Sequence, residues 1–179
     1  MVYFYLADGF EDMEALAPVD CLRRVGVEVT LVGVTGDYVT SLRGVTVKSE
    51  ARTADLENAE MIVLPGGGVG SDNLRASREV MDAVSYCAEH DIHIAAICAA
   101  PYILGDAGVL AGKRATCFPG FEEHLAGAVI VDEPVVTDGH ITTGKSAGYS
   151  IDFGLELVRV LLGDEAVEAL RNSLYAFRD

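Results

Sequence analysis

The chain has 179 residues, half of them apolar, and a formal net charge of −15 at pH 7. This length suits one domain with a substantial core, so we expect residues 1–179 to form a single domain. The acidic excess argues against binding to nucleic acid or to an anionic membrane surface, because both are bound through clusters of Lys and Arg. The longest apolar stretch, residues 94–104, is interrupted by Pro101 and is too short to span a membrane.

The four cysteines, Cys21, Cys87, Cys98 and Cys117, have neither CxxC nor CxxH spacing. The sequence passes directly from Met1 into a strand-like segment without a signal peptide, so we expect a cytoplasmic protein with reduced thiols. Neither a disulfide framework nor a metal site is expected. Cys21 and Cys87 fall within helical patterns and are expected to be small buried residues.

Short buried strands and amphipathic helices alternate along the chain. The pattern predicts strands at 2–7, 27–34, 61–64, 92–97, 113–117, 129–131, 134–137 and 140–143, with a hairpin or irregular excursion over 37–47. Helical segments are predicted from about 15 to 26, where Pro18 marks a start or a kink, and at 54–58, 77–90, 98–107, 151–163 and 164–177. Such alternation predicts an α/β fold with a doubly wound, mostly parallel sheet and helices on both faces.

Four segments follow predicted strands and contain the polar, glycine or cysteine residues that a binding site needs. They span residues 8–14, 65–70, 98–101 and 143–148. In doubly wound sheets, ligands bind beyond the carboxyl ends of the strands, near the point where the strand order reverses. We therefore expect these four segments to converge on one site.

Cys98 is the candidate nucleophile, because it directly follows an apolar strand and precedes small residues that open a helix. A cysteine on a tight strand-to-helix turn needs small neighbours, and Ala96, Ala99 and Ala100 meet that need. Pro101 suits the first helical turn, where its missing N–H has no partner to lose. Backbone N–H groups at this helix start are expected to favour the thiolate. A buried structural cysteine is the alternative.

The turn at residues 65–68, Pro-Gly-Gly-Gly, lets a backbone N–H approach a ligand closely, since glycine has no Cβ. One of these N–H groups, paired with that of Ala99, would form an oxyanion hole beside the Cys98 sulfur. A plain tight turn explains the same glycines. The segment lacks GxGxxG spacing and the Lys-Ser/Thr pair of a P-loop, so it predicts no nucleotide site.

Glu14 lies a few residues after the first strand, on the same predicted edge of the sheet. An ionised Glu14 would repel a thiolate and raise the cysteine pKa, whereas a protonated Glu14 would donate a hydrogen bond to the sulfur and stabilise the thiolate. The sequence does not choose between these states. Glu11, Asp12 and Glu14 also fit a solvated acidic turn.

Three separated motifs resemble the ThiJ/PfpI superfamily. They are residues 8–14 (DGFEDME) followed by 18–20 (PVD), residues 64–67 (LPGG), and residues 95–101 (AAICAAP). The resemblance runs over nearly the whole chain, including residues 142–150 before the last long helix. It is greatest to the branch of the parkinsonism-associated deglycase and its bacterial relatives. This resemblance implies a flavodoxin-like fold.

The resemblance also implies roles for individual residues. Cys98 would be the nucleophile and a redox sensor, and Glu14 its protonated partner. Gly67 and Ala99 would be the backbone donors. The family further implies a homodimer, with Arg24 and Arg43 near its interface.

The activities implied by the resemblance are cofactor-free glyoxalase III chemistry on methylglyoxal, removal of early glyoxal adducts from protein or nucleotide amines, and holdase chaperone action during oxidative stress. The expected partners are thus a small aldehyde or a glycated amine, with no cofactor and no metal. Our leading hypothesis is a Cys98-dependent glyoxalase III or deglycase. The alternatives are a redox sensor or chaperone without dedicated turnover, and a cysteine hydrolase or amidase acting on another small electrophile.

One position departs from the branch, which often has a histidine before a proline near the cysteine. This chain has Phe118 before Pro119, so that route supplies no general base. His124 is expected to cap or flank a short helix instead. The peptidase-like branch has a histidine directly after its nucleophile, where this chain has Ala99, and no later His–Glu pair of the amidotransferases is evident. Protease and glutaminase activities are therefore not expected.

Overall fold

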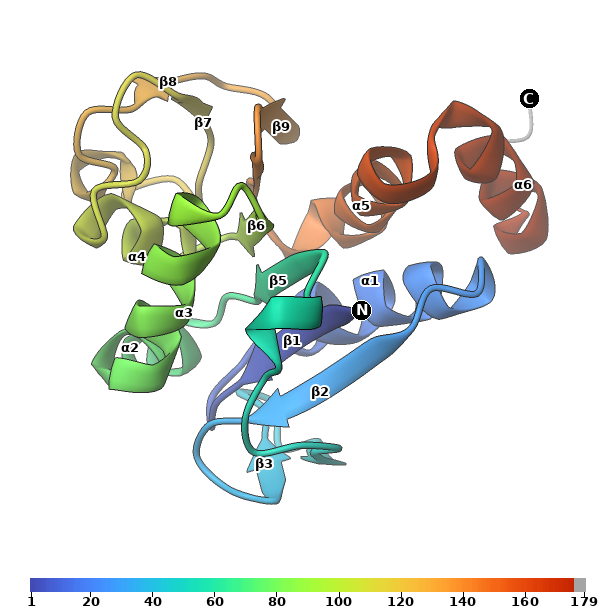
Figure 1. The fold of residues 1–179 in the computed structure, drawn as a ribbon, viewed down its shortest axis with the longest axis horizontal. Coiled ribbons are helices and arrows are strands. Elements are labelled where there is room, and N and C mark those ends of the chain that lie inside the picture. Colours follow the sequence, from blue (N-terminus) through green and yellow to red (C-terminus); the bar gives the residue numbers. More distant parts are fainter. Residues whose placement is uncertain (176–179) are drawn as a thin grey trace.

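The computed structural model describes residues 1–175, drawn in Figure 1. The strands are β1 (Val2–Leu6), β2 (Val29–Gly33), β3 (Tyr38–Thr40), β4 (Thr46–Lys48), β5 (Met61–Leu64), β6 (His93–Ile97), β7 (Arg114–Ala115), β8 (Val129–Ile130), β9 (Val135–Asp138) and β10 (Ile141–Gly144). The α-helices are α1 (Asp12–Arg24), α2 (Gly68–Ala76), α3 (Arg78–Glu89), α4 (Pro101–Asp106), α5 (Ser150–Leu162) and α6 (Asp164–Leu174). Short 3-10 helices span Leu56–Asn58, Glu122–His124 and Ala147–Tyr149.

The central sheet has six strands in the order β2-β1-β5-β6-β10-β9. Its first five strands pair in parallel, and β9 closes the edge as the antiparallel partner of β10. Counted along the chain, the parallel strands have the order 2-1-3-4-5, which is the flavodoxin-like arrangement. The predicted α/β class and the mostly parallel sheet are confirmed.

Helices cover both faces of the sheet, with α2, α3 and α4 on one side and α1, α5 and α6 on the other (Figure 1). Alternate residues of each strand point to opposite faces, and the two cores follow this rule. Phe4 belongs to the same core as Leu22 of α1 and Phe153 of α5, whereas its neighbour Tyr5 belongs to the other core, with Val84 of α3. Strands buried on both faces explain why β1, β5 and β6 read as continuous apolar runs.

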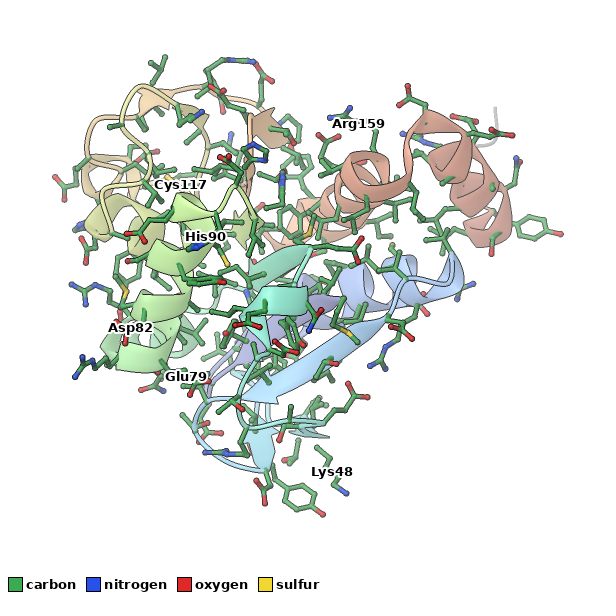
Figure 2. The ribbon with its side chains drawn as sticks, in the orientation of Figure 1. Lys48, Glu79, Asp82, His90, Cys117 and Arg159 are labelled. Atoms are coloured by element: carbon green, nitrogen blue, oxygen red, sulfur yellow. The ribbon has the colours of Figure 1, made fainter. Side chains whose placement is uncertain are left out.

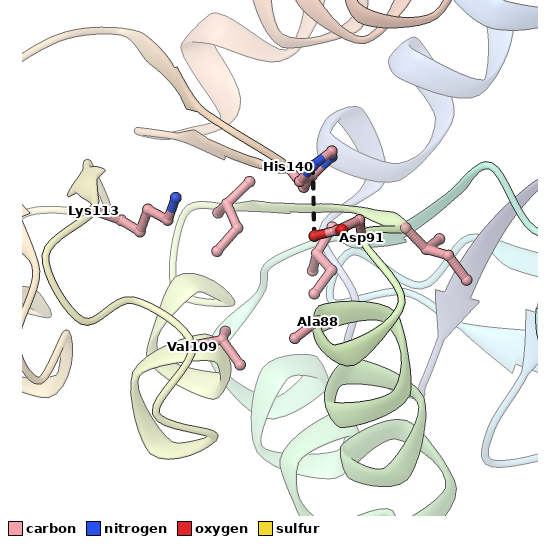
Figure 3. Close-up of a pocket in the computed structure, with 8 residues that line it drawn as sticks. Ala88, Asp91, Val109, Lys113 and His140 are labelled. Atoms are coloured by element: carbon pink, nitrogen blue, oxygen red, sulfur yellow. Dashed lines mark ion pairs between the residues drawn. The ribbon is translucent and has the colours of Figure 1, made fainter.

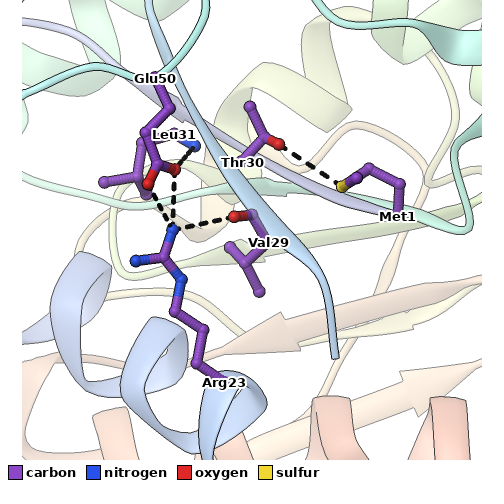
Figure 4. Close-up of polar contacts among 6 residues, drawn as sticks. All are labelled: Met1, Arg23, Val29, Thr30, Leu31 and Glu50. Atoms are coloured by element: carbon purple, nitrogen blue, oxygen red, sulfur yellow. Dashed lines mark hydrogen bonds and ion pairs between the residues drawn. The ribbon is translucent and has the colours of Figure 1, made fainter. Parts of the chain in front are cut away.

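Polar contacts join the end of α1 to β2. Arg23 donates to the Val29 carbonyl at 2.9 Å and to the Glu50 carboxylate, which in turn accepts the Leu31 N–H at 2.9 Å (Figure 4). Arg23 and Glu50 are both more than two-fifths exposed, so their ion pair adds little to the free energy of unfolding. Its main effect is to hold the end of α1 at a defined position beside β2.

Charged side chains lie at the periphery of the molecule. Lys48 of β4, Glu79 and Asp82 of α3, and Arg159 of α5 are all exposed (Figure 2). Charged side chains of both signs are thus solvated at the surface, where such residues are usually found.

Most predicted elements are found, several of them shorter than predicted, and the 37–47 hairpin is β3 paired with β4. Pro18 lies inside α1, so the helix does not begin there. Helix α2 is missing from the prediction, because its first three residues, Gly-Val-Gly, have low helix propensity and continue the glycine turn that precedes them. The predicted last helix ends at Leu174, and the end of its range at 176–177 lies outside the described residues.

Cys21 and Cys87 are buried, as predicted, and the four cysteines are free. Within residues 1–175, no helix is long and apolar enough to cross a membrane.

Candidate active site

Cys98 stands on the turn between β6 and α4, and its backbone adopts a left-handed conformation with φ +66°. Two hydrogen bonds hold that conformation. The Cys98 N–H donates to the Gly144 carbonyl at 2.9 Å, and the Cys98 carbonyl accepts the Phe118 N–H at 2.8 Å. A non-glycine residue at this φ is strained, and such strain persists only where the surroundings fix it. The turn therefore presents the Cys98 side chain in one direction.

A cavity of about 460 Å³ opens over Cys98, whose side chain is partly exposed. Its walls come from the segments that follow β1, β5, β6 and β10, as the sequence predicted. Leu42 and Arg43 of the β3–β4 hairpin, together with Phe118 and Phe121, complete the lining. The hairpin reaches the cavity because the Leu42 N–H donates to the Phe10 carbonyl at 2.8 Å.

Gly66 brings Glu14 and Cys98 together. A Cβ built on Gly66 would lie 2.4 Å from Oε2 of Glu14 and 2.7 Å from Cβ of Cys98. Only glycine leaves room for the carboxyl group and the cysteine side chain to pack against this stretch of backbone. Gly66 is thus a site residue that the sequence identified only as part of a turn.

The Glu14 side chain is completely buried in the first turn of α1. Its pKa is raised from 4.5 to about 7, chiefly by burial and also by the charge of Glu11. The Cys98 thiol and the N–H groups of Gly66 and Ala147 oppose this rise only in part, since neither carboxyl oxygen has a hydrogen-bond partner of ordinary geometry within the described residues. A protonated carboxyl is therefore accessible near neutral pH, and the solvated acidic turn is ruled out for Glu14.

The expectation that local N–H groups would make Cys98 a thiolate is wrong. The pKa of the Cys98 thiol is raised to about 12, chiefly by burial and also by the charge of Glu14 and its hydrogen bond to the thiol, although the N–H groups of Ala99 and Gly67 act against the rise. Helix α4 has six residues and begins only at Pro101, so its N-terminus is short and set back from the sulfur. Two buried acids side by side disfavour a state in which both carry charge.

Gly67 and Ala99 line the cavity beside Cys98, and their backbone N–H groups lower the pKa of its thiol. Gly67 has φ +92°, and a Cβ there would meet the Gly9 carbonyl at 2.4 Å. This conformation therefore requires glycine. Gly67 follows β5 and Ala99 follows the neighbouring strand β6, so both residues border the same cavity, and their roles as donors stay a prediction.

The two predicted interface arginines lie in different places. Arg43 lines the cavity, and its guanidinium has no ion-pair partner among the described residues. Arg24 is in the last turn of α1, paired with Asp20 at 2.6 Å, and is not part of the cavity lining. Sequence reasoning did not identify Leu42 or Phe121 as cavity residues.

None of the four histidines lines the Cys98 cavity. His93 is buried and hydrogen bonded to the Thr142 hydroxyl at 2.8 Å. His124 ends a short 3-10 helix, as predicted, and His90 stacks on Tyr86. The titratable side chain packed beside Cys98 is instead the buried carboxyl group of Glu14.

A second cavity, of about 180 Å³, lies at the amino ends of β6 and β10, at the opposite edge of the sheet. Its rim holds His140 and Asp91, 3.6 Å apart, and Lys113 (Figure 3). Its remaining lining is apolar and includes no cysteine or serine. Over residues 1–175, no group of three or more His, Cys, Asp and Glu side chains is arranged to hold a metal ion.

Known proteins resemble this chain over nearly its whole length. A model of the DJ-1/PfpI family matches residues 1–160. Protein dj-1beta of Drosophila melanogaster is 34% identical over 174 residues, which are 94% of this chain and 93% of that protein. Its crystal structure superposes with a TM-score of 0.92, covering 99% of this chain and 98% of that chain.

Two further relatives extend the comparison. The structure of oxidized Toxoplasma gondii DJ-1 has a TM-score of 0.93 and 29% identity, covering 99% of this chain and 98% of that chain. Protein DJ-1 homolog B of Arabidopsis thaliana is 36% identical over 91% of this chain, which spans only 39% of that protein. The chain belongs to the DJ-1/PfpI family, within the DJ-1 branch that its three sequence motifs predicted.

Proposed function

We propose that this protein is a cofactor-free glyoxalase III or deglycase that acts on small reactive aldehydes through Cys98. Membership of the family supports the coarser statement, a DJ-1-like stress protein, and the family includes enzymes. The observation that carries the finer proposal is the pairing of Cys98 with a fully buried carboxyl group, Glu14, whose pKa is raised to about 7.

The first step joins the thiol to the substrate. The Cys98 sulfur adds to the aldehyde carbon of an α-oxoaldehyde, and a C–S bond forms while the carbonyl π electrons move to oxygen. The N–H groups of Gly67 and Ala99 stabilise the charge on that oxygen. Glu14, in its ionised form, accepts the thiol proton as the bond forms, so that no separate buried thiolate has to exist beforehand.

The second step is an internal redox shift that needs no cofactor. Glu14, protonated in the first step, gives that proton to the alkoxide oxygen, which completes the hemithioacetal and returns Glu14 to a carboxylate. Glu14 then removes the proton from the former aldehyde carbon while the neighbouring carbonyl oxygen takes up a proton from water, which gives an enediol. Glu14 returns its proton to the neighbouring carbon as the hydroxyl on the first carbon loses its proton to water, and the product is a thioester. Water then cleaves the C–S bond and releases the 2-hydroxy acid and the thiol. Methylglyoxal plus water gives lactate, with all atoms accounted for.

The Cys98→Ser variant tests the proposal. An alcohol is far less acidic than a thiol, so this variant should lose lactate formation from methylglyoxal while keeping the wild-type fold. Release of lactate is followed enzymatically and the fold by circular dichroism. Undiminished lactate formation in Cys98→Ser would sink the proposal.

A second candidate is a redox sensor, and one observation favours it. Cys98 is partly exposed among small residues, and a relative of the same fold has been determined in an oxidized form. Glu14 in its protonated form would donate a hydrogen bond to a Cys98 sulfinate. Peroxide treatment followed by mass spectrometry separates the two candidates. Selective addition of two oxygens at Cys98 without aldehyde turnover supports the sensor.

We also propose a cytoplasmic homodimer whose partner small molecule is an aldehyde or a glycated amine. The support for the dimer is exposed apolar surface: Met13 of α1, Val45 of the hairpin and Ile151 of α5 are each about half exposed. Sedimentation equilibrium tests the dimer. A monomer at micromolar concentration would contradict it.

A further inference from the structure

Four aromatic rings form a cluster beside the Cys98 cavity. Phe118 and Phe121 pack edge to face, with ring centroids 6.5 Å apart. Phe121 also lies 6.2 Å from Tyr102 and 6.0 Å from His124. Phe118 and Phe121 line the cavity, whereas Tyr102 and His124 do not. The cavity thus has an aromatic wall, made by Phe118 and Phe121, that rests on two further rings.

The aromatic wall is fixed relative to the nucleophile. The Phe118 N–H donates to the Cys98 carbonyl at 2.8 Å, and the Phe121 N–H donates to the Phe118 carbonyl at 3.1 Å. Tyr102 is held in turn by its hydroxyl, which donates to Asp72 at 2.9 Å. A wall held in this way does not have to be ordered when a ligand binds, so little affinity is lost to that ordering.

The Phe118 ring has an open side. Its side chain is 43% exposed although it borders a cavity, and Leu42 of the hairpin, 44% exposed, adds apolar surface to the same cavity. An exposed apolar surface inside a cavity favours a ligand with an apolar group of its own. A flat ring gains most, because aromatic pairs attract one another beyond the effect of buried area.

We propose that the aromatic wall makes the Cys98 site selective for aryl-substituted α-oxoaldehydes over methylglyoxal. The dicarbonyl group lies at the Cys98 sulfur and the N–H groups of Gly67 and Ala99, and the aryl ring packs on Phe118. This inference rests on the proposed function. The chemistry is that given above: phenylglyoxal plus water gives mandelate through the same hemithioacetal and thioester, without an external oxidant or reductant.

The first test compares kcat/KM for phenylglyoxal and methylglyoxal, each divided by the rate constant of the same aldehyde with N-acetylcysteine to remove intrinsic reactivity. The wild-type ratio should favour phenylglyoxal by about tenfold. Phe118→Leu keeps an apolar side chain but removes the ring, and should lower the ratio about 3- to 10-fold. Tyr38→Leu removes an exposed aromatic ring of β3 that does not line the cavity, and should leave the ratio unchanged.

The second test does not depend on turnover. Cys98 is alkylated with iodoacetamide and with N-benzyliodoacetamide, and modification at Cys98 is followed by peptide mass spectrometry. The wild-type chain should prefer the benzyl reagent, and Phe118→Leu should lose most of that preference. If neither aldehyde is turned over but the benzyl preference depends on Phe118, the glyoxalase proposal fails and aromatic selectivity stands. Equal benzyl preference in the wild type and Phe118→Leu overturns aromatic selectivity, whatever the turnover.

Discussion

The Cys98 N–H donates to the Gly144 carbonyl at 2.9 Å, which couples the end of β10 to the turn that carries the nucleophile. The Phe118 N–H fixes the other side of the same residue by donating to the Cys98 carbonyl at 2.8 Å. These two contacts come from segments more than twenty residues apart in sequence, and together they hold Cys98 at φ +66°. The strain of this conformation is therefore maintained by tertiary structure, and it has a measurable consequence.

Replacing Cys98 by glycine should relieve that strain. An L-residue in the left-handed region costs roughly 1–2 kcal/mol, and glycine loses about 0.5–1 kcal/mol of that gain through its greater freedom in the unfolded chain. We expect Cys98→Gly to be about 0.5–1 kcal/mol more stable than Cys98→Ala in urea denaturation. Ala100→Gly is the matched control. Its φ of −55° is unstrained, so glycine there should destabilise the fold. Equal stability of the two Cys98 variants would contradict this reading of the turn.

Gly66 predicts a second effect, on packing. A methyl group at Gly66 would lie 2.4 Å from the Glu14 carboxyl, 2.7 Å from Cβ of Cys98 and 2.8 Å from the Ile97 carbonyl. We expect Gly66→Ala to lower the free energy of unfolding by about 1–3 kcal/mol, as overpacked cores do. It should also change the rate at which iodoacetamide modifies Cys98. Gly68→Ala is the control, since nothing lies within 4 Å of a Cβ there. A stability change at Gly68 as large as that at Gly66 would contradict the argument.

The fold was largely predictable from the sequence, because apolar runs and helical periodicity are local signals. The continuous apolar runs of β1, β5 and β6 report burial on both faces, and the residues after them lie at one edge whatever the details of packing. Cys98 and the glycine turn could be placed on that edge for this reason. Helix α2 was not predicted, because its first turn lies against the site, where packing overrides the low helix propensity of glycine.

The fine geometry of the site was not predictable in the same way. The sequence left the protonation of Glu14 open, since only the depth of burial decides it. The prediction of a lowered pKa for the Cys98 thiol was wrong. Burial of the thiol raises this pKa, and burial depends on tertiary contacts that the local sequence does not indicate. Leu42 and Phe121 reach the cavity from a hairpin and a loop, and no periodic pattern fixes where such segments pack.

Glu14 should give the reaction its pH dependence. The pKa of Glu14 is raised to about 7, and the ionised form is the base in the proposed mechanism, so lactate formation should rise with pH through that region. Glu14→Gln should remove this rising limb and lower kcat/KM by about 10²- to 10⁴-fold. Glu11→Gln should keep the limb but move it to lower pH, because the charge of Glu11 raises the Glu14 pKa. A pH profile that is unchanged in Glu14→Gln would assign the base to another group.

Two buried groups should also oppose each other in the pH dependence of stability. The Glu14 pKa rises from 4.5 to about 7 on folding, so the folded state binds the extra proton and stability is lost as pH rises from 4.5 to 7. The His93 pKa falls from 6.5 to about 4, chiefly through burial and also through the charge of His140, with Glu156 acting against the fall. The unfolded state then binds the extra proton, and stability is lost as pH falls from 6.5 to 4.

Each shift corresponds to about 3 kcal/mol, and the two windows overlap between pH 4.5 and 6.5, where the effects nearly cancel. Replacing either residue should reveal the pH dependence of stability that the other residue contributes. Relative to wild type, Glu14→Gln should lose stability on acidification across this range. His93→Gln, which can still hydrogen bond to the Thr142 hydroxyl, should gain stability on acidification. Urea denaturation of the three proteins at pH 4.5, 5.5 and 6.5 measures both slopes. Parallel curves for all three would show that neither group changes its proton affinity on folding.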